Sequence, residues 1–484
     1  MLFTEPTFLF AFLPVLLALY FLIDLLPGRG AAYRNVLLLV ASVVFYASGG
    51  GAFIWLILAS IAVNYGAALA IDRAHGTAAA RRLLALAVGL NLLSLVTFKY
   101  AGFLALNLNA VLTAAGQSPV PVPAIVLPIG ISFFTFHAIS YVVDVYRRDA
   151  VAQKGPVEAA LYLLLFPQLI AGPIIRYRDI AAQLAARVVG ADDVAIGIRR
   201  FVIGLGKKML IANIVAGPAD RLFALPPGEL TAALAWLAVG CYTLQIYFDF
   251  SGYSDMAIGL ARMFGFRFLE NFNYPYIAQS IQEFWRRWHI SLSAWFRDYL
   301  YVPLGGNRVA PARVYLNLLT VFFLCGLWHG ASWTFVVWGL YHGLFLVLER
   351  LGLGARLARV PRPVRHLYAL VVVMIGWVWF RAESVTGALG MLQAMAGASP
   401  HLPTPYAVSW YLTPEVAVAG LAGIIGSAPV WSALGERMAE PSAGGARLTA
   451  AASGLTVAAL AVVFAGCVML IAAHTYNPFI YFRF

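Results

Sequence analysis

A histidine at position 329 lies between two strongly apolar segments, within the stretch FLCGLWHGASWTF. An ionisable side chain at membrane depth is costly, so its presence there suggests a function. Neutral imidazole is also the side chain best matched to accepting a proton near neutral pH. Its neighbours Gly326 and Gly330 are small, so a substrate could approach the ring closely. His329 is therefore a candidate general base, and a histidine that caps a helix end is the alternative interpretation.

A second histidine, His289, lies in a segment dense in aromatic and charged residues, 280–301. The apolar side chains recur at helical spacing, which predicts one amphipathic helix over 280–301 at a membrane interface or along a cavity. By residue type alone, His289 is interpreted as a hydrogen-bonded structural residue, and so is His342. The apolar positions of the segment are Ile281, Phe284, Trp285, Trp288, Leu292, Trp295, Phe296, Tyr299 and Leu300.

Motifs of several other enzyme classes are absent from the sequence. There is no GxSxG nucleophile elbow, no HExxH and no phosphate-binding P-loop, which disfavours serine hydrolases, zinc peptidases and nucleotide hydrolases. No histidine, cysteine and carboxylate residues have metal-ligand spacing, so we expect no metal site. Three cysteines lie in apolar runs and are expected to be free and buried: Cys241, Cys325 and Cys467.

The composition predicts the elements that must position these histidines. Of the 484 residues, 62% are hydrophobic and only 11% are charged, whereas soluble proteins are about 25% charged. This excludes an ordinary soluble enzyme and a disordered chain, and it predicts an integral membrane protein. Apolar runs that could cross the membrane lie at 8–26, 35–48, 52–71, 82–98, 125–146, 201–219, 230–248, 314–328, 333–349, 366–381, 409–428 and 454–473.

A further apolar run, 157–172, contains prolines and is expected to form a re-entrant or broken helix. Three acidic residues flank the aromatic segment instead of recurring along the predicted spans. We therefore expect them to pair with arginines and not to form an ion path: Asp249, Asp255 and Glu270.

The net charge of +12 has a topological interpretation. If the N-terminus is placed outside, most lysines and arginines fall in the inward loops, as the positive-inside rule requires. The charge therefore gives no support for a nucleic-acid partner. No basic segment precedes the first apolar run, so we expect no cleaved signal peptide. We predict one membrane domain over 1–484, with N-terminal spans at 1–150, a catalytic core at 151–350 and C-terminal spans at 351–484.

Several stretches resemble the membrane-bound O-acyltransferase superfamily, and within it the bacterial alginate O-acetyltransferase branch. They occur in the family's order from residue 166 to the end of the sequence, and the two histidine-containing stretches are highly specific. They read FPQLIAGPI at 166–174, YFDFSGYSDMAIGLARMFGF at 247–266, FWRRWHISLSAWFRDYLYVPLGGNR at 284–308, GLWHGASWTF at 326–335 and NPFIYFRF at 477–484.

This resemblance implies an all-α polytopic fold of about 11–12 transmembrane helices, with re-entrant and interfacial helices around a central acyl-transfer tunnel. It implies that His329 is the essential catalytic histidine and His289 the second characteristic one. Residues expected to line or orient the substrate are Arg297, Asp298, Asn307 and Trp328. No bound cofactor is expected, and the acyl donor is expected to be acetyl-CoA or another acyl thioester.

The function that follows is transfer of an acetyl group from a cytoplasmic thioester across the bacterial inner membrane, for O-acetylation of an extracytoplasmic polysaccharide. The expected partners are membrane lipid, a periplasmic SGNH-like acetyltransferase and the machinery of polysaccharide synthesis. Two alternatives within the superfamily are D-alanyl transfer to teichoic acid and transfer of longer acyl chains to lipids. A non-enzymatic alternative is a transporter for an acyl carrier or a polysaccharide precursor.

Overall fold

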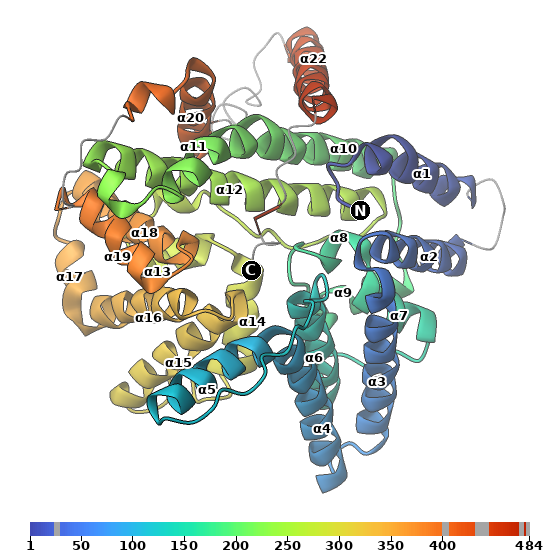
Figure 1. The fold of residues 1–484 in the computed structure, drawn as a ribbon. Helices are drawn as coiled ribbons and strands as arrows, with labels where there is room; N and C mark the ends of the chain where they lie inside the picture. Colours follow the sequence, from blue (N-terminus) through green and yellow to red (C-terminus); the bar gives the residue numbers. More distant parts are fainter. Residues whose placement is uncertain (24–29, 399–405, 431–444, 474–478, 481–484) are drawn as a thin grey trace. The chain divides into compact units, whose positions relative to one another are not determined.

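The computed structural model describes residues 1–23, 30–398, 406–430, 445–473 and 479–480 (Figure 1). In these ranges all regular secondary structure is helical and no strand is present. The all-α fold predicted from the sequence is therefore confirmed. The chain divides into two compact units, of which the first contains Met1–Ile198 and Ala257–Leu269 and the second contains Arg199–Met256 and Glu270–Phe484.

The helices of the first unit are α1 (Leu13–Leu22), α2 (Gly30–Gly50), α3 (Ile54–Arg73), α4 (Ala78–Leu95), α5 (Ala101–Ala114), α6 (Ile131–Arg147), α7 (Pro156–Leu164), α8 (Phe166–Leu169) and α9 (Tyr177–Ala185). Helices α10 (Ala191–Gly206) and α12 (Ala232–Met263) contribute residues to both units. The second unit holds α11 (Asn213–Phe223), α13 (Ile281–Arg287), α14 (Ile290–Phe296), α15 (Pro311–His329), α16 (Trp333–Leu348), α17 (Gly354–Leu357), α18 (Arg362–Arg381), α19 (Val385–Met395), α20 (Pro414–Gly426) and α22 (Gly445–Ala472).

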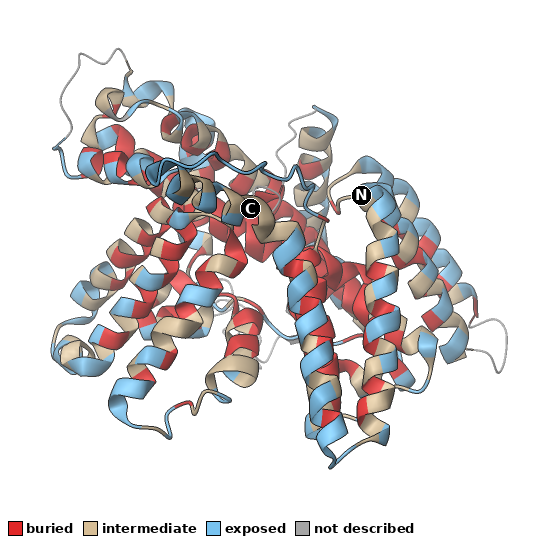
Figure 2. Cartoon of the chain, turned by 60° about the horizontal axis from the view of Figure 1, so that its bottom comes forward, coloured by how far each residue is buried: buried red, intermediate tan, exposed pale blue. Residues whose placement is uncertain are grey.

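The helices of the described ranges match a multi-pass membrane protein. Eight helical stretches are long and apolar enough to cross a membrane, and three shorter apolar helices accompany them. Their outer faces carry large apolar side chains with no protein cover, such as Leu93, which is 60% exposed, and Leu455, which is 73% exposed (Figure 2). Lipid can solvate such faces, whereas water would not. The long stretches are Gly30–Arg73, Ala78–Ala114, Ala191–Phe223, Ala232–Met263, Pro311–His329, Trp333–Leu357, Arg362–Arg381 and Gly454–Ala472.

The apolar run 157–172 forms a broken helix, as predicted. Helix α7 ends before Leu165, whose backbone (φ −53°, ψ 113°) is not helical, and α8 begins at Phe166. Pro167 lies in the first turn of α8, where its missing N–H is not needed. All four residues of α8 are fully buried, so protein surrounds the broken backbone as the membrane environment requires.

The prediction of one continuous helix over 280–301 is wrong, because the segment is interrupted at His289. Helix α13 ends at Arg287, and His289 adopts a left-handed conformation (φ 44°, ψ 55°) before α14 begins. The chain then continues as a π-helix, η8 (Arg297–Tyr301). Two N–H groups at the start of α14 bond to Asn271 instead of to the preceding turn. The backbone N–H of Ile290 donates to the Asn271 backbone carbonyl at 2.9 Å, and that of Ser291 donates to the Asn271 side-chain oxygen at 3.1 Å. A partner distant in sequence therefore determines the break.

The acidic residues near the aromatic segment are paired, as predicted, although lysines share this role with arginine. Asp255 lies 2.8 Å from Arg200 and 2.6 Å from Lys207, and Arg200 also pairs with Glu270. Buried Asp249 pairs with Lys208. The three cysteines predicted to be free and buried have that state in the structure.

Helices α15 and α16 pack closely side by side (Figure 1). A Cβ atom on Gly326 would lie 2.3 Å from the carbonyl oxygen of Phe335, and one on Gly339 would lie 2.2 Å from that of Phe322. Helix backbones approach this closely in membranes only where small residues occupy the interface. The two glycines therefore set the separation of α15 and α16.

Replacement of Gly339 by alanine is expected to destabilise the protein, because the new methyl group would meet backbone that cannot move aside. Overpacking of this kind costs about 1–3 kcal/mol. The matched control is Gly240→Ala in α12, where a Cβ meets nothing within 4 Å, and where alanine gains up to about 1 kcal/mol of helix propensity. Thermal unfolding of the detergent-solubilised protein would measure both. Equal melting temperatures for the two variants would show that the crossing is not tight.

Candidate active site

His329 is the last residue of α15 and is almost fully buried, with 4% of its surface exposed. Aromatic rings surround its imidazole. The ring centroid lies 4.9 Å from that of Trp328, 5.0 Å from that of Trp338 on α16 and 5.1 Å from that of Phe380 on α18. The ring planes are steep to one another, which is a favourable arrangement for aromatic pairs. Three helices of the second unit therefore enclose this imidazole.

His289 is fully buried and is oriented by Asn271. Its Nδ1 lies 3.1 Å from the side-chain oxygen of Asn271, which also accepts a hydrogen bond from the backbone N–H of Ser291 at 3.1 Å. Because a backbone N–H can only donate, the contacting atom of Asn271 is its oxygen, and Nδ1 of His289 must carry the proton. Nε2 is then the basic nitrogen. Nε2 is buried and has no hydrogen-bond partner among the described residues.

Trp328 brings the two histidines into one cluster. Its ring centroid lies 4.9 Å from that of His329 and 6.3 Å from that of His289. The other side of the His289 ring contacts Phe250 of α12, at 4.6 Å. The structure thus unites three of the residues proposed from the sequence, although it does not test their roles.

Sequence reasoning interpreted His342 as a structural residue, yet its ring contacts Trp338, which also contacts His329. Its ring centroid lies 5.4 Å from that of Trp338 and 5.2 Å from that of Trp285. A Cβ on Gly376 would lie 2.5 Å from its Nε2, so the backbone of α18 closes over the ring. His342 lies on α16, thirteen residues after His329, and this position gave no signal that could separate it from an ordinary buried residue.

The three polar residues predicted beside the histidines have other contacts. Arg297 and Asp298 pair with each other at 2.7 Å, and Arg297 remains 61% exposed. The side-chain oxygen of Asn307 accepts hydrogen bonds from the Tyr301 hydroxyl at 2.7 Å and from Arg350 at 2.9 Å. These contacts explain how the residues are held, and their part in substrate binding stays a prediction. Within the described ranges, no group of three His, Cys, Asp or Glu side chains could hold a metal ion.

The fold is that of a multi-pass membrane protein that encloses a cluster of buried histidines and aromatic rings. Residues 53–389, which include the whole cluster, match the model of the membrane-bound O-acyltransferase family. The chain therefore belongs to this family and is an acyltransferase.

Curated relatives place the chain more closely within the family. It is 43% identical to the probable alginate O-acetylase AlgI of Azotobacter vinelandii and 42% identical to that of Pseudomonas putida, in each case over all of both chains. It is 37% identical to the peptidoglycan O-acetyltransferase of Helicobacter pylori, over 82% of this chain and 80% of that protein.

The state of His289 predicts a dependence of stability on pH. Burial lowers the pKa of this imidazole to about 3, whereas an unfolded histidine has a pKa of about 6.5. The folded protein therefore excludes a proton that the unfolded chain binds below that value. The contribution is fully present above about pH 6.5 and is lost as the pH falls toward 3.

Melting temperatures measured between pH 8 and pH 5 would test this dependence. The wild-type protein should lose more stability on acidification than the His289→Gln variant, in which this group cannot titrate. The exposed His75 provides the control, because His75→Gln should keep the wild-type profile. Parallel profiles for wild type and His289→Gln would contradict the assignment of a buried neutral imidazole.

Proposed function

We propose that the protein transfers an acetyl group from a thioester donor to an acceptor hydroxyl, for O-acetylation of a polysaccharide, and that His329 is the catalytic base. The observation that carries the proposal is the burial of His329 beside Trp328 and within one aromatic cluster with His289. The full-length similarity to proteins named alginate O-acetylase supports an acetyl donor and alginate as the acceptor.

The proposed chemistry follows from the side chains in the cluster. The imidazole of His329 accepts the proton of the acceptor hydroxyl, and the oxygen attacks the carbonyl carbon of the thioester. The carbon–sulfur bond then breaks, and the leaving thiolate takes up the proton from the imidazolium. Every atom and charge is accounted for without a cofactor.

A hydrogen-bond donor would stabilise the negative charge that develops on the carbonyl oxygen. The indole N–H of Trp338 can fill this role, since it is buried with no acceptor among the described residues and its ring contacts His329. His289 is suited to the opposite task, because its Nε2 can accept a proton or a hydrogen bond but cannot donate one. We assign it to the orientation of the acceptor hydroxyl, and Arg297, Asp298 and Asn307 to the outer part of the substrate path.

The charge pattern supports transfer from the cytoplasm outward. Placement of the N-terminus outside the inner membrane puts the arginine-rich loop 350–365 in the cytoplasm, beside a donor such as acetyl-CoA or another acyl thioester. The acetyl group would then leave on the outer side, to a periplasmic SGNH-like acetyltransferase that works with the polysaccharide synthesis machinery. We further propose that 1–484 acts as a single functional domain, because the family match runs through both compact units.

Replacement of His329 by alanine is expected to abolish polysaccharide acetylation, because the general base is removed. General base catalysis contributes about 10²–10⁴-fold to a rate, so acetyl content should fall below detection in cells that depend on the variant. The acetyl content would be measured by NMR of the purified polysaccharide, with protein abundance determined in the membrane fraction.

The control for this experiment is His75→Ala, which removes an exposed histidine outside the cluster and should leave acetylation unchanged. Normal acetylation by a stable His329→Ala protein would refute the proposed catalytic role. Purified protein in proteoliposomes with labelled acetyl-CoA, or with a D-alanyl thioester, would identify the donor.

A further inference from the structure

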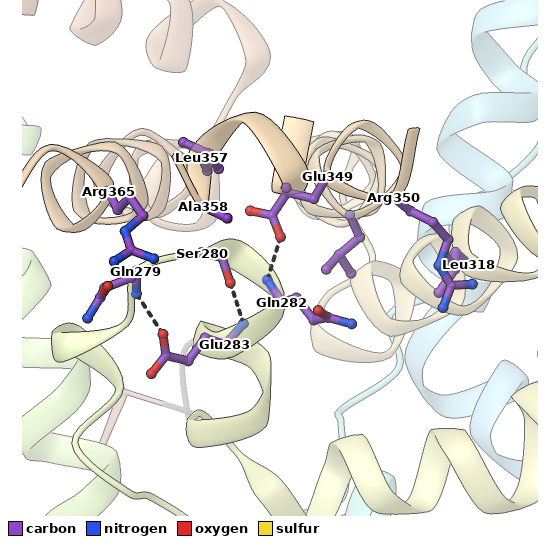
Figure 3. A pocket seen from close by; sticks show the side chains of 12 residues that line it. Gln279, Ser280, Gln282, Glu283, Leu318, Glu349, Arg350, Leu357, Ala358 and Arg365 are labelled. Carbon is purple, nitrogen blue, oxygen red and sulfur yellow. Dashed lines mark hydrogen bonds between the residues drawn. The ribbon is translucent and has the colours of Figure 1, made fainter. Parts of the chain in front are cut away.

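A cavity of about 500 Å³ lies in the second unit, where the N-terminal end of α13 meets the short helical segment Glu349–Leu357 between α16 and α18 (Figure 3). Its volume falls in the range of small-molecule sites. Polar side chains and leucines share its wall. The lining residues include Gln279, Ser280, Glu283, Glu349, Arg350 and Arg365.

Both carboxylates in this wall already have partners. Glu349 accepts hydrogen bonds from the backbone N–H groups of Ile281 at 2.6 Å and Gln282 at 3.0 Å. Glu283 accepts one from the backbone N–H of Gln279 at 2.9 Å, and it pairs with Arg287 at 2.9 Å. Figure 3 shows the carboxylate of Glu349 turned toward Gln282 and that of Glu283 turned toward Gln279. Among the described residues, neither carboxylate forms an ion pair with Arg350 or Arg365.

The two arginines of the wall have no carboxylate partner among the described residues. Arg350 is exposed and donates one hydrogen bond, to the neutral amide oxygen of Asn307 at 2.9 Å. Nε of Arg365 is buried without a hydrogen-bond partner within the described ranges. In Figure 3 the guanidinium of Arg365 is directed toward Gln279 and Ser280, at the other end of the cavity from Arg350. Arg365 as a whole is half-buried, but a buried N–H donor without an acceptor is costly, so a ligand with acceptor oxygens is expected there.

We infer that this cavity binds the phosphate groups of an anionic ligand, with Arg350 and Arg365 as the recognition residues. The planar guanidinium matches phosphate oxygens with two parallel hydrogen bonds, which makes arginine the side chain of choice for such groups. Leucines at 318, 346 and 357 provide an apolar wall for the part of the ligand that adjoins the phosphate. The phosphate could belong to a soluble nucleotide-type coenzyme or to the headgroup of an anionic phospholipid.

The cavity and the histidine cluster share helix α13. Its polar residue Glu283 faces the cavity, and the next two residues, Phe284 and Trp285, pack against His342. A ligand in the cavity would therefore contact an element that supports the cluster. The inference itself stands on the cavity alone, and it does not rest on the acyl-transfer proposal.

Binding to the purified full-length protein in nanodiscs of neutral phosphatidylcholine tests the soluble source. The probes are coenzyme A and inorganic pyrophosphate, with titration calorimetry as the readout. Arg365→Gln and Arg350→Gln should each weaken binding by about tenfold or more, because each removes a charge-assisted contact. Arg365→Lys should recover part of the affinity, since it restores the charge without the fork.

The matched control is Arg359→Gln, which removes an exposed arginine from the same loop that does not line the cavity. It should change affinity less than about twofold if the contact is specific, since a distant exposed charge acts only weakly through solvent. The lipid arm uses native mass spectrometry of the protein with phosphatidylglycerol, applied to the same variants. Loss of bound phosphatidylglycerol in Arg350→Gln and Arg365→Gln, but not in Arg359→Gln, would assign the cavity to a headgroup.

Two results would overturn the inference. One is that neither probe nor phosphatidylglycerol binds to the wild-type protein. The other is that Arg359→Gln weakens binding as much as the two cavity variants, which would indicate general attraction to a basic loop. Melting temperatures of all variants would establish that they remain folded. Because no turnover is measured, binding should persist in His329→Ala even if the proposed acyl transfer proves wrong.

Discussion

The close crossing of α15 and α16 is the constraint on which the histidine cluster depends. At Gly326 and Gly339 the two backbones leave no room for a Cβ. His329 ends α15 just after one glycine, and Trp338 immediately precedes the other, so their contact follows from the crossing. A wider separation of the helices would remove the aromatic wall from the imidazole. In a membrane, where apolar surface has little drive to associate, this packing must come from small residues.

The second constraint is the hydrogen bond that gives His289 its tautomer. Asn271 supplies one oxygen to the imidazole and to the N–H of Ser291, and its backbone carbonyl holds Ile290. The same residue therefore breaks the helix and fixes which nitrogen is basic. The left-handed backbone at His289 is uncommon for a residue with a side chain. These local bonds explain why it persists.

Much of this fold can be predicted from the sequence, because lipid imposes simple rules. Long apolar runs located α15, α16, α18 and α22, and Pro167 located the break between α7 and α8. The acidic residues of the aromatic segment could be expected to pair, since an unpaired charge is costly there.

The break at His289 could not be predicted in this way, since the periodicity of 280–301 is continuous and Asn271 lies outside it. The ring contacts of the cluster depend on how α14, α15, α16 and α18 pack. These contacts join the two histidines through Trp328 and include Trp338, Phe380 and His342. Such contacts have no signature in local sequence. The resemblance to a known family identified His289 and His329, because the motifs of a family reflect residues that its common fold brings together.

We propose that the acyl group passes from the donor to the acceptor within the aromatic cluster around His329. A cryo-electron microscopy structure of the purified protein with a thioether analogue of acetyl-CoA, which cannot transfer its acyl group, tests this claim most directly. The account predicts that the analogue's carbonyl carbon lies beside His329, with room for an acceptor hydroxyl within about 3.5 Å of the imidazole. An analogue bound elsewhere, with the rings of Trp328, Trp338 and Phe380 still closed over His329, would contradict it.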